Sequence, residues 1–168
     1  MGRLGISNSY DARAIEETHV FALDVEALEH VLALDGDRGD KVQENLELAV
    51  FFDGIPEMAG LGSSARLSLA GQVEIHEFEE GEHVVEEGQP ADSLFLIQSG
   101  ECVVWRALEG GGEEVLAKLG PGQTFGEIGL LFEKPRSATV TCLEPSVLVE
   151  VSRGALETAL RQSFHVGL

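Results

Sequence analysis

Residues 125–140 read Phe-Gly-Glu-Ile-Gly-Leu-Leu-Phe-Glu-Lys-Pro-Arg-Ser-Ala-Thr-Val, and this stretch is the most informative part of the chain. It places a glycine-opened helical turn, the acidic Glu127 and the lone Arg136 between two strand-like segments. The free N–H groups of a helix start attract phosphate, and an arginine fork can pair with two phosphate oxygens. A carboxylate accepts hydrogen bonds from sugar hydroxyls. The stretch therefore predicts a site for a small anion that carries a sugar.

Short apolar segments separated by glycines lie on both sides of this stretch. The predicted strands are Val73–Phe78, His83–Glu86, Leu94–Gln98, Glu101–Ala107, Glu114–Leu119, Ala138–Leu143 and Val147–Val151. Many short strands with regular turn signals predict a β-sandwich or barrel. Helical segments before and after the strands make the expected fold class α+β.

Two helices are predicted before the strands. Residues 41–52 carry apolar side chains with the spacing of an amphipathic helix, at Val42, Leu46, Ala49 and Val50. Gly54-Ile55-Pro56 ends this helix, and a second one is predicted over residues 65–72, with Leu67, Leu69 and Ala70. Two roles are open for both helices, namely packing against the β-domain and relaying a signal.

The segment from Phe125 through Pro135-Arg136 to Val140 closely resembles the phosphate-binding cassette of cyclic-nucleotide-binding domains. The patterns Phe78-x-x-Gly81, Gly88-x-x-x-Asp92 and Leu94-Phe95-Leu96-Ile97-x-x-Gly100 resemble the jelly-roll of the same family. Together these similarities cover roughly residues 46–160. The resemblance implies an α+β fold in which a β-jelly-roll barrel (a double-stranded β-helix) is flanked by N- and C-terminal helices.

The resemblance also implies a set of ligand-binding residues. In the family, the residue matching Glu127 accepts the ribose 2′-hydroxyl, and the one matching Arg136 holds the equatorial phosphate oxygens. The whole expected set is Phe125, Gly126, Glu127, Ile128, Gly129, Arg136, Ser137 and Ala138. Ile128, Leu130 and Leu131 are expected to face the core. Most family members have alanine where Gly129 stands, so this glycine should loosen the turn slightly and affect affinity.

Glu127 and Arg136 each have a structural alternative. Thr124-Phe125-Gly126-Glu127 matches a capping box, in which threonine and glutamate satisfy each other's backbone N–H groups. Arg136 has Glu133 nearby as a surface ion-pair partner, an interaction worth only about 0–1 kcal/mol. The resemblance favours the binding role for both residues.

The sequence leaves two features of the site open, the identity of the nucleotide and the residue that covers its base. A hydroxyl at Ser137 can accept a hydrogen bond from the 2-amino group of guanine, or it can bond the phosphate, so cAMP and cGMP are both candidate ligands. The lid that covers the base in the family has only Phe164 and His165 as candidates here, and neither is assigned.

Charge limits the partners. The chain has 168 residues, of which 30 are acidic and 11 basic, for a net charge of −19. Such a surface repels nucleic acid and anionic lipid, so neither is an expected partner. A phosphate ligand remains compatible, because exposed charges are largely screened beyond about 8 Å at physiological salt. No apolar run approaches the ~20 residues that span a bilayer, and residues 1–10 lack the apolar core of a signal peptide.

Cys102 and Cys142 are the only cysteines, and both lie in apolar, strand-like segments. They are interpreted as reduced core thiols of a cytoplasmic protein. Neither a metal site nor a cofactor beyond the cyclic nucleotide is expected.

A repeated segment indicates the domain organisation. Residues 20–29 can be laid over residues 148–157 without a gap, 128 positions later, as an apolar strand, an N-cap (Asp24 or Ser152) and a helix start. Residues 1–45 are therefore predicted to be the tail of a preceding cyclic-nucleotide-binding domain, and residues 46–168 to form the domain described above.

The predicted function is a regulatory sensor, most similar to the tandem domains of cyclic-nucleotide-dependent protein kinases. It has no enzymatic activity of its own, and a kinase catalytic domain is its expected partner, in the same chain or a separate one. One alternative is a docking module that has lost its ligand. Another is a metal-dependent enzyme on the same jelly-roll, but His76 and His83 do not form the clustered histidines that it requires.

Overall fold

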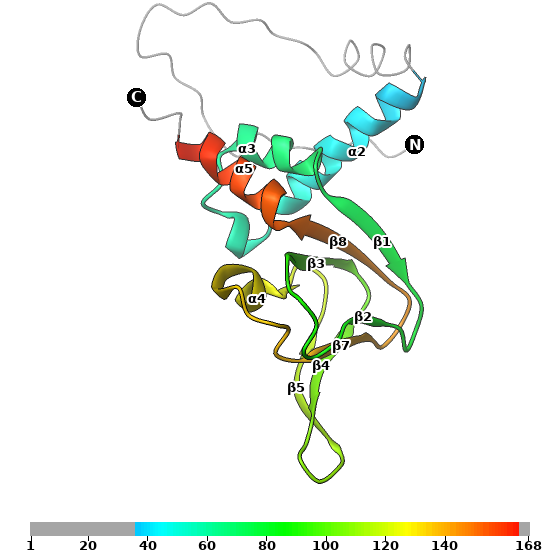
Figure 1. Ribbon diagram of the computed structural model, residues 1–168. Helices are drawn as coiled ribbons and strands as arrows, with labels where there is room; N and C mark the ends of the chain where they lie inside the picture. The colour runs from blue at the N-terminus through cyan, green and yellow to red at the C-terminus, as the bar shows by residue number, and fades with distance from the viewer. Residues whose placement is uncertain (1–35, 165–168) are drawn as a thin grey trace, which may run out of the picture.

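The computed structural model describes residues 36–164 (Figure 1). Three helical segments come first, α2 (Gly36–Asp53), the 3₁₀ helix η1 (Pro56–Met58) and α3 (Ser63–Ala70). The strands are β1 (Glu74–Phe78), β2 (His83–Val85), β3 (Ser93–Ser99), β4 (Cys102–Ala107), β5 (Glu113–Leu119), β6 (Thr124–Phe125), β7 (Thr139–Cys142) and β8 (Ser146–Ser152). Helix α4 (Glu127–Phe132) follows β6, and α5 (Arg153–Phe164) follows β8.

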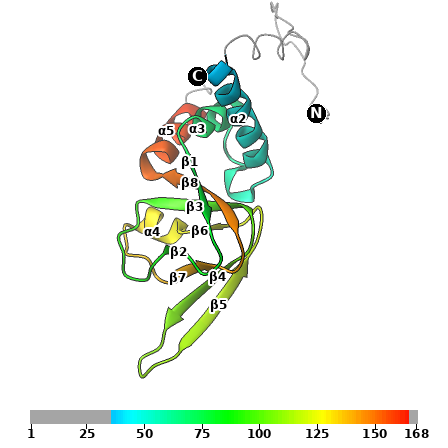
Figure 2. The ribbon, with the colours of Figure 1, turned by 90° about the vertical axis from the view of Figure 1, so that its right-hand side faces the viewer.

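The strands form two antiparallel four-stranded sheets, with orders β1-β8-β3-β6 and β2-β7-β4-β5. Figure 2 shows α2, α3 and α5 gathered at one end of these sheets, while the β4–β5 hairpin projects at the other end. The predicted α+β jelly-roll with flanking helices is confirmed. Each of the seven predicted strands is present, with ends that differ by no more than one residue, whereas β6 was not predicted.

The core has two parts that share the strands β3 and β8. The register pairs Leu96 with Val149 and Ile97 with Leu148. Leu96 and Val149 pack with the helices, whereas Ile97 and Leu148 pack between the two sheets with Phe95, Phe125, Val140 and both cysteines. Strands that are buried on both faces read as continuous apolar runs, which explains Leu94-Phe95-Leu96-Ile97.

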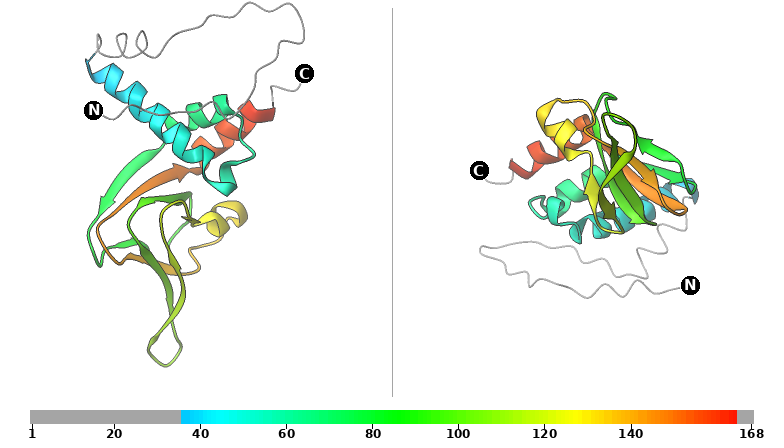
Figure 3. Two further views of the ribbon diagram at one scale, coloured as in Figure 1. Left: turned by 180° about the vertical axis from the view of Figure 1, so that it is seen from behind. Right: turned by 90° about the horizontal axis from the view of Figure 1, so that it is seen from below.

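Helix α2 packs on a different face from the predicted one. Its buried side chains are Leu48 and Phe52, whereas Val42, Leu46 and Val50 are exposed. Only the last turns of α2 reach the barrel, and Figure 3 shows the first turns extending beyond it. Burial therefore follows the position of the barrel rather than the apolar spacing. The predicted domain boundary at residue 45 falls inside this continuous helix.

Several sequence-based predictions fall outside the described residues. These are the repeat at residues 20–29, the tail at residues 1–35 and the lid candidate His165. None of the helices within residues 36–164 combines the length and apolar character that a bilayer-spanning segment needs.

Candidate functional site

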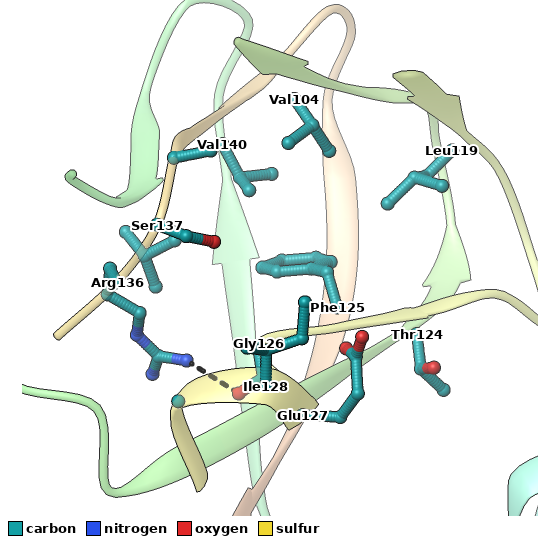
Figure 4. Close-up of a pocket in the computed structure, with 13 residues that line it drawn as sticks. Val104, Leu119, Thr124, Phe125, Gly126, Glu127, Ile128, Arg136, Ser137 and Val140 are labelled. Atoms are coloured by element: carbon teal, nitrogen blue, oxygen red, sulfur yellow. Dashed lines mark hydrogen bonds between the residues drawn. The ribbon is translucent and has the colours of Figure 1, made fainter. Parts of the chain in front are cut away.

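A cavity of about 240 Å³ lies between β6, α4 and the chain that leads into β7 (Figure 4). All eight predicted ligand-binding residues line it, although they come from two separate segments. The remaining lining residues are Val85, Val104, Leu119, Thr124 and Val140. These five residues were not predicted to line a site. The four apolar ones lie on strand faces, and strand periodicity does not show which faces meet.

Gly126 forms the entry to α4 and allows the arginine to approach it. Its backbone is left-handed, with φ of 90°, a conformation that side chains other than glycine rarely adopt. A Cβ atom at this position would also clash with Nη1 of Arg136. Two independent constraints therefore require glycine here.

The alternative interpretation of Glu127 as part of a capping box does not hold. The N-cap of α4 is Gly126, no side chain caps this helix, and Thr124 belongs to β6. The half-buried carboxylate of Glu127 makes no hydrogen bond or ion pair with any residue between 36 and 164, and it lines the cavity in Figure 4. Glu127 is thus available to a ligand rather than used by the fold.

Arg136 is 7% exposed, so it is not the surface ion-pair residue of the alternative interpretation. Its Nη1 donates to the carbonyl oxygens of Ser93 at 2.8 Å and Gly126 at 3.3 Å, and its Nη2 donates to Ser93 Oγ at 3.2 Å. The guanidinium also lies 5.8 Å from the centre of the Phe95 ring. Glu133 instead approaches Arg153, at 3.9 Å.

The charge of Arg136 has only neutral hydrogen-bond partners. Within residues 36–164, no carboxylate lies within 4.0 Å of its guanidinium. Burial lowers the pKa of Arg136 below its usual value, and the more distant carboxylates of Asp92 and Glu150 oppose this shift. Because arginine stays protonated in proteins, a buried positive charge with no carboxylate in contact among residues 36–164 remains beside the cavity.

The backbone of Arg136 is fixed by the segment between β2 and β3. The N–H of Arg136 donates to the carbonyl of Gln89, and the N–H of Gly88 donates to the carbonyl of Arg136, both at 2.8 Å. The backbone at the base of the side chain is therefore held on both sides.

Gly129 is buried and contacts the same segment. A Cβ atom on Gly129 would overlap the Cβ atom of Ala91 and would lie 3.0 Å from the carbonyl oxygen of Lys134. The expected effect of this glycine on affinity stays a prediction, and the structure adds a packing role. Gly129 makes room for Ala91, which packs directly against α4.

The side chains of α4 point in different directions from those expected. Leu130 is buried as predicted, but Ile128 and Leu131 are exposed, and Ile128 lines the cavity. In a helix of six residues, only one side can reach the core, and Gly129 and Leu130 occupy it.

Ser137 and Ala138 form the wall next to Arg136. The exposed Ser137 makes no hydrogen bond with other residues of the described range, and Figure 4 shows its hydroxyl on the cavity side. Ala138, Val85, Val104 and Val140 provide apolar surface near it. The cavity thus combines a cation, a free carboxylate, a free hydroxyl and an apolar wall.

The site can be compared with known proteins. The family model described as the cyclic nucleotide-binding domain matches residues 75–163, more than half of the chain. A cAMP-dependent protein kinase regulatory subunit from Mycosarcoma maydis is 37% identical over 90 residues, which are 54% of this chain and 17% of that protein.

Solved structures show the same fold. The regulatory domain of Toxoplasma gondii PKA in co-crystals with cAMP aligns with a TM-score of 0.67 and 19% identity, over 74% of this chain and 48% of that one. The regulatory subunit of a cAMP-independent protein kinase A from Trypanosoma cruzi, bound to guanosine, aligns with a TM-score of 0.66 and 22% identity. The alignment covers 75% of this chain and 45% of that one. The chain thus spans about half of these structural relatives and a smaller part of the Mycosarcoma maydis protein. The family match confirms the resemblance seen in the cassette, and the chain belongs to the cyclic nucleotide-binding domain family.

Proposed function

We propose that this chain binds a cyclic nucleotide monophosphate, cAMP or cGMP, in the cavity beside α4. The observation that carries the proposal is the buried guanidinium of Arg136, which has no carboxylate partner within the described residues and borders the cavity. An entering phosphate would provide the missing negative charge.

The other residues of the cavity support a nucleotide rather than a simple anion. The carboxylate of Glu127 has no partner in the described part of the chain and can accept a hydrogen bond from the ribose 2′-hydroxyl. Val85, Val104 and Val140 offer apolar surface to a purine. Micromolar affinity needs about 8 kcal/mol, and each charge-assisted hydrogen bond contributes about 1.5–3 kcal/mol. Arg136, Glu127 and two or three backbone N–H groups can together reach this value if burial of the purine offsets the ordering cost of binding.

Calorimetric titration of this chain with cAMP and with cGMP tests the proposal. We expect at least one of them to bind in the micromolar range or tighter, and Arg136→Ala to weaken binding by more than about 2 kcal/mol. Arg106→Ala is the matched control, because Arg106 pairs with Glu114 on the β4–β5 hairpin and does not line the cavity.

Two results would contradict the proposal. Absence of binding by both nucleotides would favour the alternative function, a docking module without a ligand. One observation supports this alternative. Arg136 already donates hydrogen bonds to the carbonyl oxygens of Ser93 and Gly126, so a phosphate must compete with these acceptors. Equal affinities for guanosine and cGMP would show that the phosphate contributes nothing to binding.

The selectivity of Ser137 has its own test. The ratio of the cAMP and cGMP affinities, compared between the wild type and Ser137→Ala, shows which nucleotide Ser137 favours.

We also propose that the domain acts in the cytoplasm as the regulatory, non-enzymatic part of a cyclic-nucleotide-dependent protein kinase. The similarity to the Mycosarcoma maydis regulatory subunit supports this context. The test is whether the chain, joined to or mixed with a candidate kinase catalytic domain, makes the phosphorylation rate depend on the nucleotide. A rate that is unaffected by the chain, with and without nucleotide, would contradict this context and leave the binding proposal standing.

A further inference from the structure

Three potential metal ligands meet on one face of β1 and β8, outside the cavity beside α4. Glu74 and His76 are two residues apart in β1, so their side chains point to the same side of the sheet. The antiparallel register places Glu150 of β8 directly opposite Glu74. Sequence separation hides this group, because His76 and Glu150 are 74 positions apart along the chain. It was therefore not expected from the sequence.

The distances within this group suit a single ion. The Nε2 atom of His76 lies 2.8 Å from Oε2 of Glu150 and 3.8 Å from Oε2 of Glu74. One ligand atom from each of the three residues can be chosen so that all lie within 4.8 Å of one another. Donors bound at about 2.1 Å to a tetrahedral ion are about 3.4 Å apart, so small side-chain rotations suffice.

The charges of the group are unbalanced without a cation. Glu74 and Glu150 are like charges directly opposite each other on neighbouring strands, an arrangement that destabilises a sheet. The imidazole of His76 hydrogen-bonds one of the two carboxylates, that of Glu150, through Nε2 at 2.8 Å. A divalent cation would neutralise both carboxylates and use the imidazole nitrogen as its third donor.

The space beside the group can hold the remaining ligands of an ion. A cavity of about 280 Å³ is lined by His76 and Glu150 and also by Asp92 and Arg136. Two carboxylates, Glu150 and Asp92, line this space together with Arg136, whose guanidinium is already bonded to Ser93. Glu74 lies beside Glu150 and His76. Water molecules can therefore complete the coordination, and the local charge favours a cation.

From these contacts we propose that Glu74, His76 and Glu150 bind a divalent transition-metal ion of the Zn²⁺ class. The mixture of one imidazole nitrogen and two carboxylate oxygens selects the ion, because Mg²⁺ and Ca²⁺ prefer oxygen ligands alone. The proposal does not depend on nucleotide binding, since neither Glu127 nor the other residues of α4 take part.

Calorimetric titration of the tag-free chain with ZnCl₂, in the absence of nucleotide, tests the proposal. We expect one ion per chain with micromolar affinity, and an increase of the Kd by at least about tenfold in His76→Ala and in Glu150→Gln. His83→Ala is the matched control, because His83 lies on β2 and bonds Thr141, away from the three ligands. MgCl₂ should give no comparable binding.

Glu74→Gln keeps the test decisive if the other variants fold poorly. The Glu74 side chain is 79% exposed, so this change should leave the melting temperature intact while it weakens Zn²⁺ binding. Absence of Zn²⁺ binding in the wild type would overturn the proposal. So would unchanged affinity in folded His76→Ala and Glu74→Gln, which would place the ion elsewhere.

Discussion

The methyl group of Ala91 lies against the backbone of Gly129, so that a Cβ atom on Gly129 would overlap it. This contact joins the segment before β3 to α4, the helix that lines the proposed nucleotide site. The same segment holds the backbone of Arg136 through Gly88 and Gln89. Both halves of the site are therefore positioned by one short stretch of chain.

This contact predicts the effect of an alanine at position 129. Gly129→Ala should destabilise the domain by about 1–3 kcal/mol, as overpacking of a close contact does, and should weaken nucleotide binding by displacing α4. Ala91→Gly removes the opposing methyl group but not the carbonyl of Lys134, so the double variant should recover part of both properties. Thermal unfolding and calorimetric titration of the two single variants and the double variant measure this coupling. A Gly129→Ala chain with unchanged stability and affinity would show that the contact is not tight.

Arg136→Lys tests whether the shape of the guanidinium matters as well as its charge. Lysine keeps the positive charge but lacks the planar fork that pairs with two phosphate oxygens. It also cannot donate to both Ser93 and Gly126 in the same geometry. We expect cyclic nucleotide affinity to fall by at least about tenfold, which is about 1.4 kcal/mol. If Arg136→Lys bound the cyclic nucleotide as tightly as the wild type, only the positive charge at this position would matter, and not the shape of the guanidinium.

Glu127→Ala should weaken binding through the ribose hydroxyl alone. If the Glu127 carboxylate accepts the 2′-hydroxyl, the wild type should bind the 2′-deoxy analogue of the preferred nucleotide more weakly, by about 1.5–3 kcal/mol. Glu127→Ala should then show little further difference between the two ligands. Titration of both proteins with both ligands gives the coupling energy directly. If the losses of binding free energy from Glu127→Ala and from removal of the 2′-hydroxyl were additive, the 2′-hydroxyl would contact a residue other than Glu127.

The cysteine pair predicts a loss of stability at high pH. Cys102 and Cys142 are both buried, and their Sγ atoms lie 3.8 Å apart across β4 and β7. Burial, followed by the proximity of Cys142, raises the pKa of Cys102 to about 12. An unfolded cysteine has a pKa of about 8.5, so the folded chain retains a proton that the unfolded chain loses.

The sign of this effect follows from the raised pKa. The stabilising contribution is fully present below about pH 8.5 and is lost as the pH rises towards 12. The free energy of unfolding should therefore decrease more steeply over this range in the wild type than in Cys102→Ala. Denaturant unfolding of both proteins between pH 8 and pH 11 gives the comparison, with each protein at pH 7 as its own reference. Parallel curves would contradict the raised pKa.

Local pattern was sufficient for much of this domain. Alternating or continuous apolar residues between glycines gave seven of the eight strands, because the spacing of side chains along a strand repeats every two residues. The two residues of β6 were too short to show such a pattern. The eight predicted ligand residues followed from the resemblance of one stretch of the chain to the phosphate-binding cassette, and all of them line the cavity.

Long-range packing decided which side chains are buried and which distant residues meet, and the amino-acid pattern did not show this. The apolar spacing of α2 did not reveal that Leu48 and Phe52, rather than Val42, Leu46 and Val50, reach the core. The pairing of Gly129 with Ala91 and the meeting of Glu74, His76 and Glu150 depend on how distant segments are brought together. A sequence records which side chains are apolar or charged at each position, and so it specifies the strands, the cassette and the family. Which of these side chains face each other is decided by sheet register and by the packing of helices on the barrel, because those contacts join residues that are far apart in the chain.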